Sequence, residues 1–207
     1  MDGTLIDSVW TISHLLNLLR NSLGLKALPN IDYYPWLSLG GIDLVSNALE
    51  VDVHKAKYYL NVFRSEYMKI DTSKSILYEG TFQCLEALKN SNFYLAICTN
   101  KPRNLAIKVL KETGIYHFFD YINAGGDLPN KKPDASNLIS CLNFLNIKNY
   151  EAVMIGDSRL DQILAENAKT PFIFFSEGYN DGVKLNNKTL IIKKHCDVIP
   201  LIKKGIH

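Results

Sequence analysis

The sequence lacks the features that would tie the chain to a membrane or to nucleic acid. It contains no apolar run of about 18 residues, the length that a membrane-spanning helix needs. No basic segment followed by an apolar stretch opens the chain, so no secretory signal is predicted. The formal net charge of +2 is too small to indicate binding to nucleic acid or to an anionic membrane. We therefore expect a cytoplasmic protein.

Cysteine and histidine are few and are not spaced as metal ligands. The four cysteines form no CxxC pair, and we interpret them as reduced thiols: Cys84, Cys98, Cys141 and Cys196. Cys98 lies in an apolar run and is expected to be a small buried side chain. The five histidines show no ligand spacing and are predicted to have no functional role.

The composition is that of a soluble globular protein. Hydrophobic residues make up 47% and charged residues 21% of 207 residues. A chain of this length can bury a core without metal or disulfide support. It suits one domain with an inserted subdomain, or two small domains.

Helical periodicity dominates the first third of the chain. Apolar residues recur at helical spacing over 12–23, a second helix is predicted near Gly41, and a third carries Leu60 and Phe63 on one face. Pro29 and Pro35 mark a loop. We therefore predict an all-helical region over residues 9–76.

From residue 80 onward, short apolar runs alternate with helical patterns. Strands are predicted at 94–98, 121–124, 152–155 and 172–175. Helices are predicted after Gly80 and at 103–113, 134–146 and 159–168. Unbroken apolar strands that alternate with helices indicate a mostly parallel sheet covered on both faces. The predicted fold class is α/β, a Rossmann-like three-layer core with an inserted helical subdomain.

Polar side chains follow three of these strands, where open α/β sheets bind ligands. Thr99 and Asn100 follow the first visible strand, and both can donate to phosphate oxygens. Lys132 lies in the polar loop after the second strand. If a helix starts near Ser158, Asp157 and Asp161 project to the same side of its first turn, and two such carboxylates suit Mg²⁺.

This set of residues suits phosphoryl transfer from a phosphomonoester. A carboxylate that attacks an anionic phosphate needs positive charge nearby, which Mg²⁺ and a lysine can supply. Each element alone has an ordinary alternative, such as a turn, a helix cap or a solvated loop. The prediction depends on these three elements together with a fourth, the opening Asp2-Gly-Thr loop, in one order along one sheet.

The opening residues complete a resemblance to the haloacid dehalogenase-like hydrolases, and among them to the phosphoglycolate phosphatase-like group with a helical cap. The resemblance covers essentially the whole chain. The motifs that carry it are Asp2-Gly-Thr-Leu-Ile-Asp-Ser, Thr99 in Cys98-Thr-Asn-Lys-Pro, Lys132-Pro-Asp, Gly156-Asp-Ser-Arg-Leu-Asp161, Gly125-Gly-Asp and Gly178-Tyr-Asn-Asp-Gly.

The resemblance implies a role for each of these residues. Asp2 is expected to be the general acid and base and to place its backbone carbonyl on the metal. Asp157 is expected to bind Mg²⁺ directly and Asp161 through the outer sphere. The expected phosphate ligands are Thr99, Asn100 and Lys132, of which Lys132 also counts as catalytic.

The resemblance also implies how the chain is organised. Residues 1–11 and 77–207 would form the core, and residues 12–76 the cap that selects the substrate. The expected partner is a small phosphorylated metabolite, and the protein is expected to be a monomer or homodimer.

Two departures from the family pattern bear on these expectations. Lys169 stands where the family usually has glycine. The nucleophilic aspartate of the family would directly precede Met1, at the end of a central strand. Three interpretations follow: a phosphatase with this strand upstream of Met1, a truncated phosphate-binding chain, or an interaction module. The retained Thr99, Lys132 and metal carboxylates favour the first, and we expect the 207-residue chain alone to be inactive.

Overall fold

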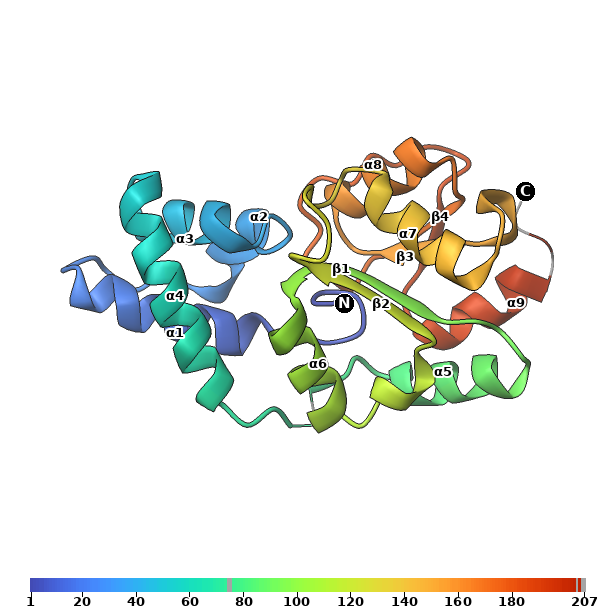
Figure 1. The fold of residues 1–207 in the computed structure, drawn as a ribbon, viewed down its shortest axis with the longest axis horizontal. Coiled ribbons are helices and arrows are strands. Elements are labelled where there is room, and N and C mark those ends of the chain that lie inside the picture. The colour runs from blue at the N-terminus through green and yellow to red at the C-terminus, as the bar shows by residue number, and fades with distance from the viewer. Residues whose placement is uncertain (74–75, 204, 206–207) are drawn as a thin grey trace.

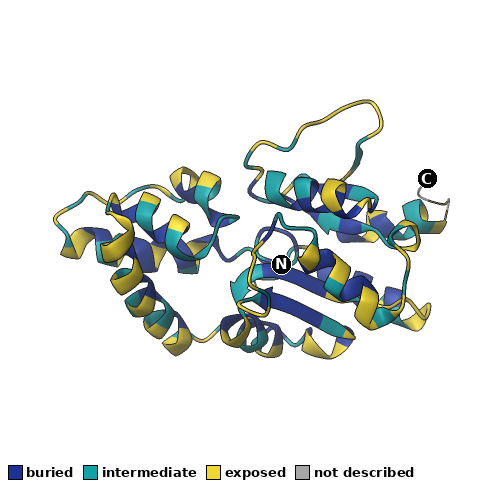
Figure 2. Cartoon of the chain, turned by 45° about the horizontal axis from the view of Figure 1, so that its top comes forward, coloured by how far each residue is buried: buried dark blue, intermediate teal, exposed yellow. Residues whose placement is uncertain are grey.

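The computed structural model describes residues 1–73, 76–203 and 205, and it shows a group of helices beside an α/β core (Figure 1). Most of the strand residues are buried, while the outer faces of the helices are exposed (Figure 2). No helix among the described residues is long and apolar enough to cross a membrane. All four cysteines are free thiols, and Cys98 is buried as expected.

Four α-helices form the helical part, which we call the cap. Its elements are α1 (Val9–Ser22), a 3₁₀ turn η1 (Asn30–Tyr33), α2 (Tyr34–Leu37), α3 (Gly41–Leu49) and α4 (Val53–Lys69). Helix α4 begins after Asp52, whose carboxylate accepts hydrogen bonds from two backbone N–H groups of the first turn. The prediction of helices in this region is confirmed. The predicted domain limits remain a prediction, and residues 74 and 75 near the expected end of the cap lie outside the described residues.

Among the described residues, the core contains five α-helices and five strands. The helices are α5 (Thr81–Asn90), α6 (Arg103–Glu112), α7 (Ser136–Leu145), α8 (Arg159–Ala168) and α9 (Val198–Lys203). The strands are β1 (Ala96–Pro102), β2 (Tyr121–Gly125), β3 (Met154–Gly156), β4 (Phe172–Phe175) and β5 (Leu190–Ile192). Every strand pair is parallel, as the apolar runs predicted.

The strands form two separate sheets among the described residues. Strands β1 and β2 make one, and β3, β4 and β5 the other, so β1 and β3 each have a free inner edge. A cavity of about 450 Å³ lies between these edges, and β1, β3, α5, α7 and α9 all contribute to its lining. Met1 lines the cavity as well. We call this cavity the strand slot. The predicted absence of a central strand is thus confirmed.

The observed elements differ from the predicted ones mainly in β1 and near the C-terminus. Strand β1 extends to Pro102, because pairing resumes at Gly125 after an irregularity that follows Cys98. Thr99 and Asn100 therefore lie within the irregular end of β1 and not beyond it. Strand β5 and helix α9 were not predicted, since three and six residues give too short a pattern.

Candidate functional site

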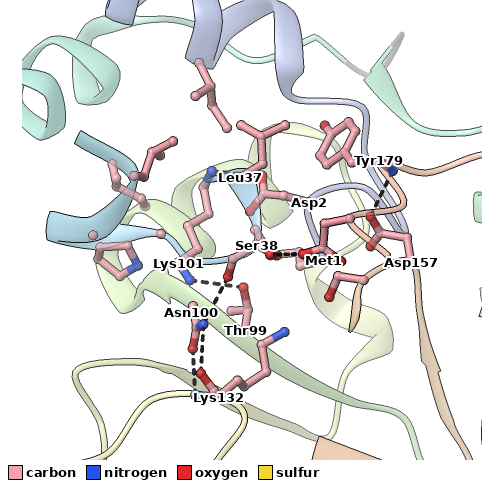
Figure 3. A pocket seen from close by; sticks show the side chains of 18 of the residues that line it. Met1, Asp2, Leu37, Ser38, Thr99, Asn100, Lys101, Lys132, Asp157 and Tyr179 are labelled. Atoms are coloured by element: carbon pink, nitrogen blue, oxygen red, sulfur yellow. Dashed lines mark hydrogen bonds and ion pairs between the residues drawn. The ribbon is translucent and has the colours of Figure 1, made fainter. Parts of the chain in front are cut away.

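A pocket of about 80 Å³ lies between the cap and the carboxyl ends of β1 and β3 (Figure 3). Six side chains that the sequence singled out all line it: Asp2, Thr99, Asn100, Lys132, Asp157 and Asp161. They come from segments far apart in the chain, and the parallel strands bring them together at one edge. Met1 lines both this pocket and the strand slot, so the two cavities meet at Met1.

Asp157 follows β3 and is fixed by two hydrogen bonds. Its carboxylate accepts from the Thr4 hydroxyl at 2.7 Å and from the backbone N–H of Tyr179 at 3.0 Å. A Cβ at position 178 would lie 2.3 Å from the Asp157 Cβ, so only glycine fits beside it. Burial, followed by the negative charge of Asp161, raises the pKa of Asp157 to about 6.

Asp161 is held by the start of its own helix and by Lys132. Ser158 is the N-cap of α8, and its hydroxyl donates to Asp161 at 2.8 Å. The Lys132 ammonium lies 2.7 Å from the Asp161 carboxylate, and 8% and 5% of these side chains are exposed. Burial alone would raise the pKa of Asp161, but the charges of Lys132 and of the N-terminal amino group, together with the hydrogen bonds from Lys132 and Ser158, lower that pKa. Asp161 lies in the first turn of α8 as expected, whereas Asp157 precedes the N-cap and lies outside that turn.

Asn100 joins the loop after β2, which carries Lys132, to the cap. Its side-chain oxygen accepts from the backbone N–H of Lys132 at 2.9 Å, and its amide nitrogen donates to the carbonyl of Ser38 at 3.1 Å. The side chain is therefore already engaged with backbone groups, and its expected contact with phosphate remains a prediction. The buried Thr99 hydroxyl accepts from the Lys101 backbone N–H at 3.1 Å.

The sequence analysis missed the role of Lys101, which connects Asp2 to the cap. Its ammonium lies 3.0 Å from the Asp2 carboxylate and 3.0 Å from the Tyr67 hydroxyl of α4. Ser8 also donates to Asp2, at 2.6 Å. Burial would raise the pKa of Asp2, but the charges of Lys101 and of the N-terminal amino group, with the hydrogen bonds from Ser8 and Lys101, hold that pKa below its usual value. The position of Lys101, directly after Asn100, was the available signal.

Among the cap aromatics, Tyr34 belongs to the site. It lines the pocket, and its ring centroid lies 5.0 Å from that of Tyr179. Tyr33 is fully buried in the cap core, and Trp36 packs against it with 6.0 Å between ring centroids. Tyr179 was quoted only as part of a motif, yet its hydroxyl accepts the backbone N–H of Ser8 at 2.8 Å. It thereby ties the loop after β4 to the opening loop.

The acids suit a hard cation only in part. Among the described residues, no three His, Cys, Asp or Glu side chains are grouped closely enough to hold a metal ion. Asp157 fits, because it is a buried carboxylate that forms no side-chain ion pair among the described residues, and because burial and the charge of Asp161 raise its pKa. Asp161 is paired with Lys132 and Asp2 with Lys101, so both carboxylates already have a cationic partner. The expected outer-sphere role of Asp161 and backbone role of Asp2 remain predictions.

Comparison with known proteins finds relatives in both sequence and fold. A phosphoglycolate phosphatase of Psychrobacter arcticus is 35% identical over 87% of this chain and 83% of its own length. One of Colwellia psychrerythraea is 30% identical over 90% of this chain and 86% of its own. The crystal structure of a predicted phosphoglycolate phosphatase from Haemophilus somnus superposes with a TM-score of 0.83 at 22% identity, over 98% of this chain and 95% of that one.

The family itself follows from a match over most of the chain. The model of the haloacid dehalogenase-like hydrolases matches residues 1–175. With the relatives above, it confirms the resemblance to the phosphoglycolate phosphatase-like group and the predicted enzyme class, phosphoric monoester hydrolases. The chain belongs to the haloacid dehalogenase-like hydrolase family.

Proposed function

We propose that this protein hydrolyses a small phosphomonoester in a Mg²⁺-dependent reaction, with phosphoglycolate as the first substrate to test. The observation that carries the proposal is the convergence of Thr99, Lys132 and Asp157 on one pocket beside Asp2. Relatives named phosphoglycolate phosphatase support this choice of substrate. We also propose a cytoplasmic protein, monomeric or homodimeric, that acts on a small metabolite.

The nucleophile in this proposal is an aspartate joined directly to Met1. The Met1 amino group is buried among the charges of Lys132, Asp161, Asp2 and Asp157. A residue bonded to it has its Cα about 3.8 Å from that of Met1, and so enters the same pocket. The strand slot offers room for the strand that would carry this aspartate.

The proposed reaction has two steps. A carboxylate oxygen of the upstream aspartate attacks phosphorus while the bond to the leaving alkoxide breaks, and Asp2 gives that alkoxide a proton. Asp2 then takes a proton from water, which attacks the aspartyl-phosphate and releases phosphate. Bound Mg²⁺ would offset the negative charge between nucleophile and phosphate, with Asp157 as its carboxylate ligand.

The pair of Asp2 and Lys101 bears on both steps. The ionised Asp2 that Lys101 favours is the form that deprotonates water. Protonation of the alkoxide needs the acid form instead. A substrate phosphate that draws the Lys101 ammonium away would raise the pKa of Asp2 toward that form.

The test is phosphate release by a chain extended upstream with an apolar strand that ends in aspartate. Its matched control ends in asparagine. Both are assayed with Mg²⁺ or EDTA on phosphoglycolate, p-nitrophenyl phosphate, a sugar phosphate and a nucleotide. Mg²⁺-dependent release by the aspartate form alone is the expected result. Equal release by the 207-residue chain would contradict the proposed nucleophile. If neither extended form nor the 207-residue chain releases phosphate, the interpretation of the protein as an interaction module is favoured instead.

A further inference from the structure

Helix α4 of the cap contributes an arginine to the functional pocket. Leu60, Phe63, Arg64 and Tyr67 all line the pocket from this helix. Their spacing of three and four residues places them on one helical face. Phe63 and Tyr67 are buried. Arg64, which lies between them in the sequence, is half-buried. The cap therefore presents one cation to the site, opposite the core residues Thr99 and Lys132.

Arg64 has no partner among the residues that the structure describes. Its Nε is buried and makes no hydrogen bond. The other pocket cations are satisfied, since Lys101 pairs with Asp2 and Lys132 with Asp161. Arginine stays charged even where burial lowers its pKa, as it does here. A buried charged donor without an acceptor is costly, so the position favours an anionic ligand.

The carboxylates of the pocket already accept hydrogen bonds from groups other than Arg64. Asp2 and Asp161 hold the two lysines, and Asp157 accepts from Thr4 and Tyr179. Asp181 accepts from the Ser38 hydroxyl and from the backbone of Arg159. None of these contacts includes Arg64, so the position favours an acceptor that comes with the substrate.

We propose that Arg64 is a specificity-determining residue that binds a carboxylate carried by the phosphorylated substrate. This assignment rests on the proposed function, in which Thr99 and Lys132 take the phosphate at the core side of the pocket. The opposite end of a short substrate then faces α4. The planar guanidinium matches a carboxylate through two parallel hydrogen bonds. Substrates with an uncharged tail would leave Arg64 unpaired, so the enzyme discriminates against them.

Equilibrium binding tests this without requiring turnover. Phosphoglycolate is compared with ethyl phosphate, which has a methyl group in place of the carboxylate, by calorimetry on the 207-residue chain with Mg²⁺. Wild type is expected to prefer phosphoglycolate by about tenfold or more, the usual range for a charge-assisted hydrogen bond. Arg64→Met should abolish this preference and leave ethyl phosphate binding unchanged, while Arg64→Lys should retain part of it.

The matched control is Lys57→Met, which removes the same charge from an exposed position of α4. It should keep the wild-type preference. The assignment would be overturned if Arg64→Met kept the wild-type preference, or if it weakened the binding of both ligands equally. It would also be overturned if wild type did not bind phosphoglycolate. If Arg64→Met does not fold, Arg64→Gln is used, and its melting temperature is measured. The proposed hydrolase activity is tested by a different assay: if it is wrong, the extended chain will release no phosphate.

Discussion

The Lys101 ammonium lies 3.0 Å from the Asp2 carboxylate, and the pair is nearly buried, with 7% and 18% of the side chains exposed. The same ammonium lies 4.3 Å from the centroid of the Tyr67 ring in α4. One lysine thus contacts both the opening loop and the cap. Removing it leaves a largely buried carboxylate without its main partner.

We expect Lys101→Met to reduce the free energy of unfolding by about 2–4 kcal/mol, because it leaves the Asp2 carboxylate buried without its cationic partner. Asp2→Asn combined with Lys101→Met should recover at least about 1 kcal/mol of that loss, since no charge is then left unpaired. Urea denaturation of wild type, the two single variants and the double variant measures this. Strict additivity of the two single effects would show that the pair is not coupled.

Asp157→Asn should remove the stabilisation by Mg²⁺. Ligands that bind only the folded state raise its stability, by about 2.7 kcal/mol at a hundredfold excess over Kd. We expect wild type to melt several degrees higher with millimolar Mg²⁺ than with EDTA. The amide that replaces the carboxylate in this variant carries no charge for the cation, so the shift should vanish. Asp32→Asn, at an exposed site of the cap, is the control that keeps it. A shift that survives Asp157→Asn would place the metal elsewhere.

His195 should make the fold sensitive to mild acid. It is buried, its Nε2–H donates to the Thr4 carbonyl at 2.7 Å, and Nδ1 lies 3.2 Å from the Thr81 hydroxyl. Burial lowers its pKa below the ordinary 6.5. The unfolded chain then binds the proton more readily, so stability falls as pH drops through about 6.5 toward the lowered pKa, by about 1.4 kcal/mol per unit of lowering.

The measurement is the free energy of unfolding between about pH 7.5 and 5. His195→Gln, which has no titrating group, should lose less stability than wild type over this interval. His54→Gln, at an exposed site on α4, should follow the wild-type curve. A His195→Gln curve parallel to wild type would exclude this histidine as the source.

Much of the core could be predicted from the sequence, whereas the contacts between cap and core could not. Parallel strands buried on both faces leave unbroken apolar runs, so the limits of β4 and α8 agree with prediction. Asp157 and Asp161 follow from strand order and helix geometry. Lys101 contacts Tyr67, and Arg64 reaches the pocket, only because of how α4 packs against β1. No local sequence pattern predicts this packing.

Lys169→Gly should stabilise the protein. Lys169 ends α8 in the left-handed conformation, with φ at 53°, which a residue with a Cβ adopts at a cost. The family usually has glycine here, and the departure noted in the sequence thus falls on a conformationally strained position. We expect a gain of about 0.5–1 kcal/mol, measured by urea denaturation. Lys169→Ala keeps the Cβ and should show no such gain. Equal effects of both changes would point to the lysine side chain and not to the backbone.

Filling the strand slot should stabilise the fold independently of catalysis. A strand between β1 and β3 pairs both free edges and buries apolar side chains against α5 and α7. At about 1 kcal/mol per backbone hydrogen bond, several bonds and the apolar burial give at least about 3 kcal/mol. We therefore expect the chain extended by an apolar strand that ends in asparagine to melt about 6–12 °C above the 207-residue chain, although it cannot form the aspartyl-phosphate. An extension of equal length with lysines at alternate positions should not produce this increase, because the slot is lined mainly by apolar side chains. Equal melting of both extensions would mean that the slot does not accept a strand.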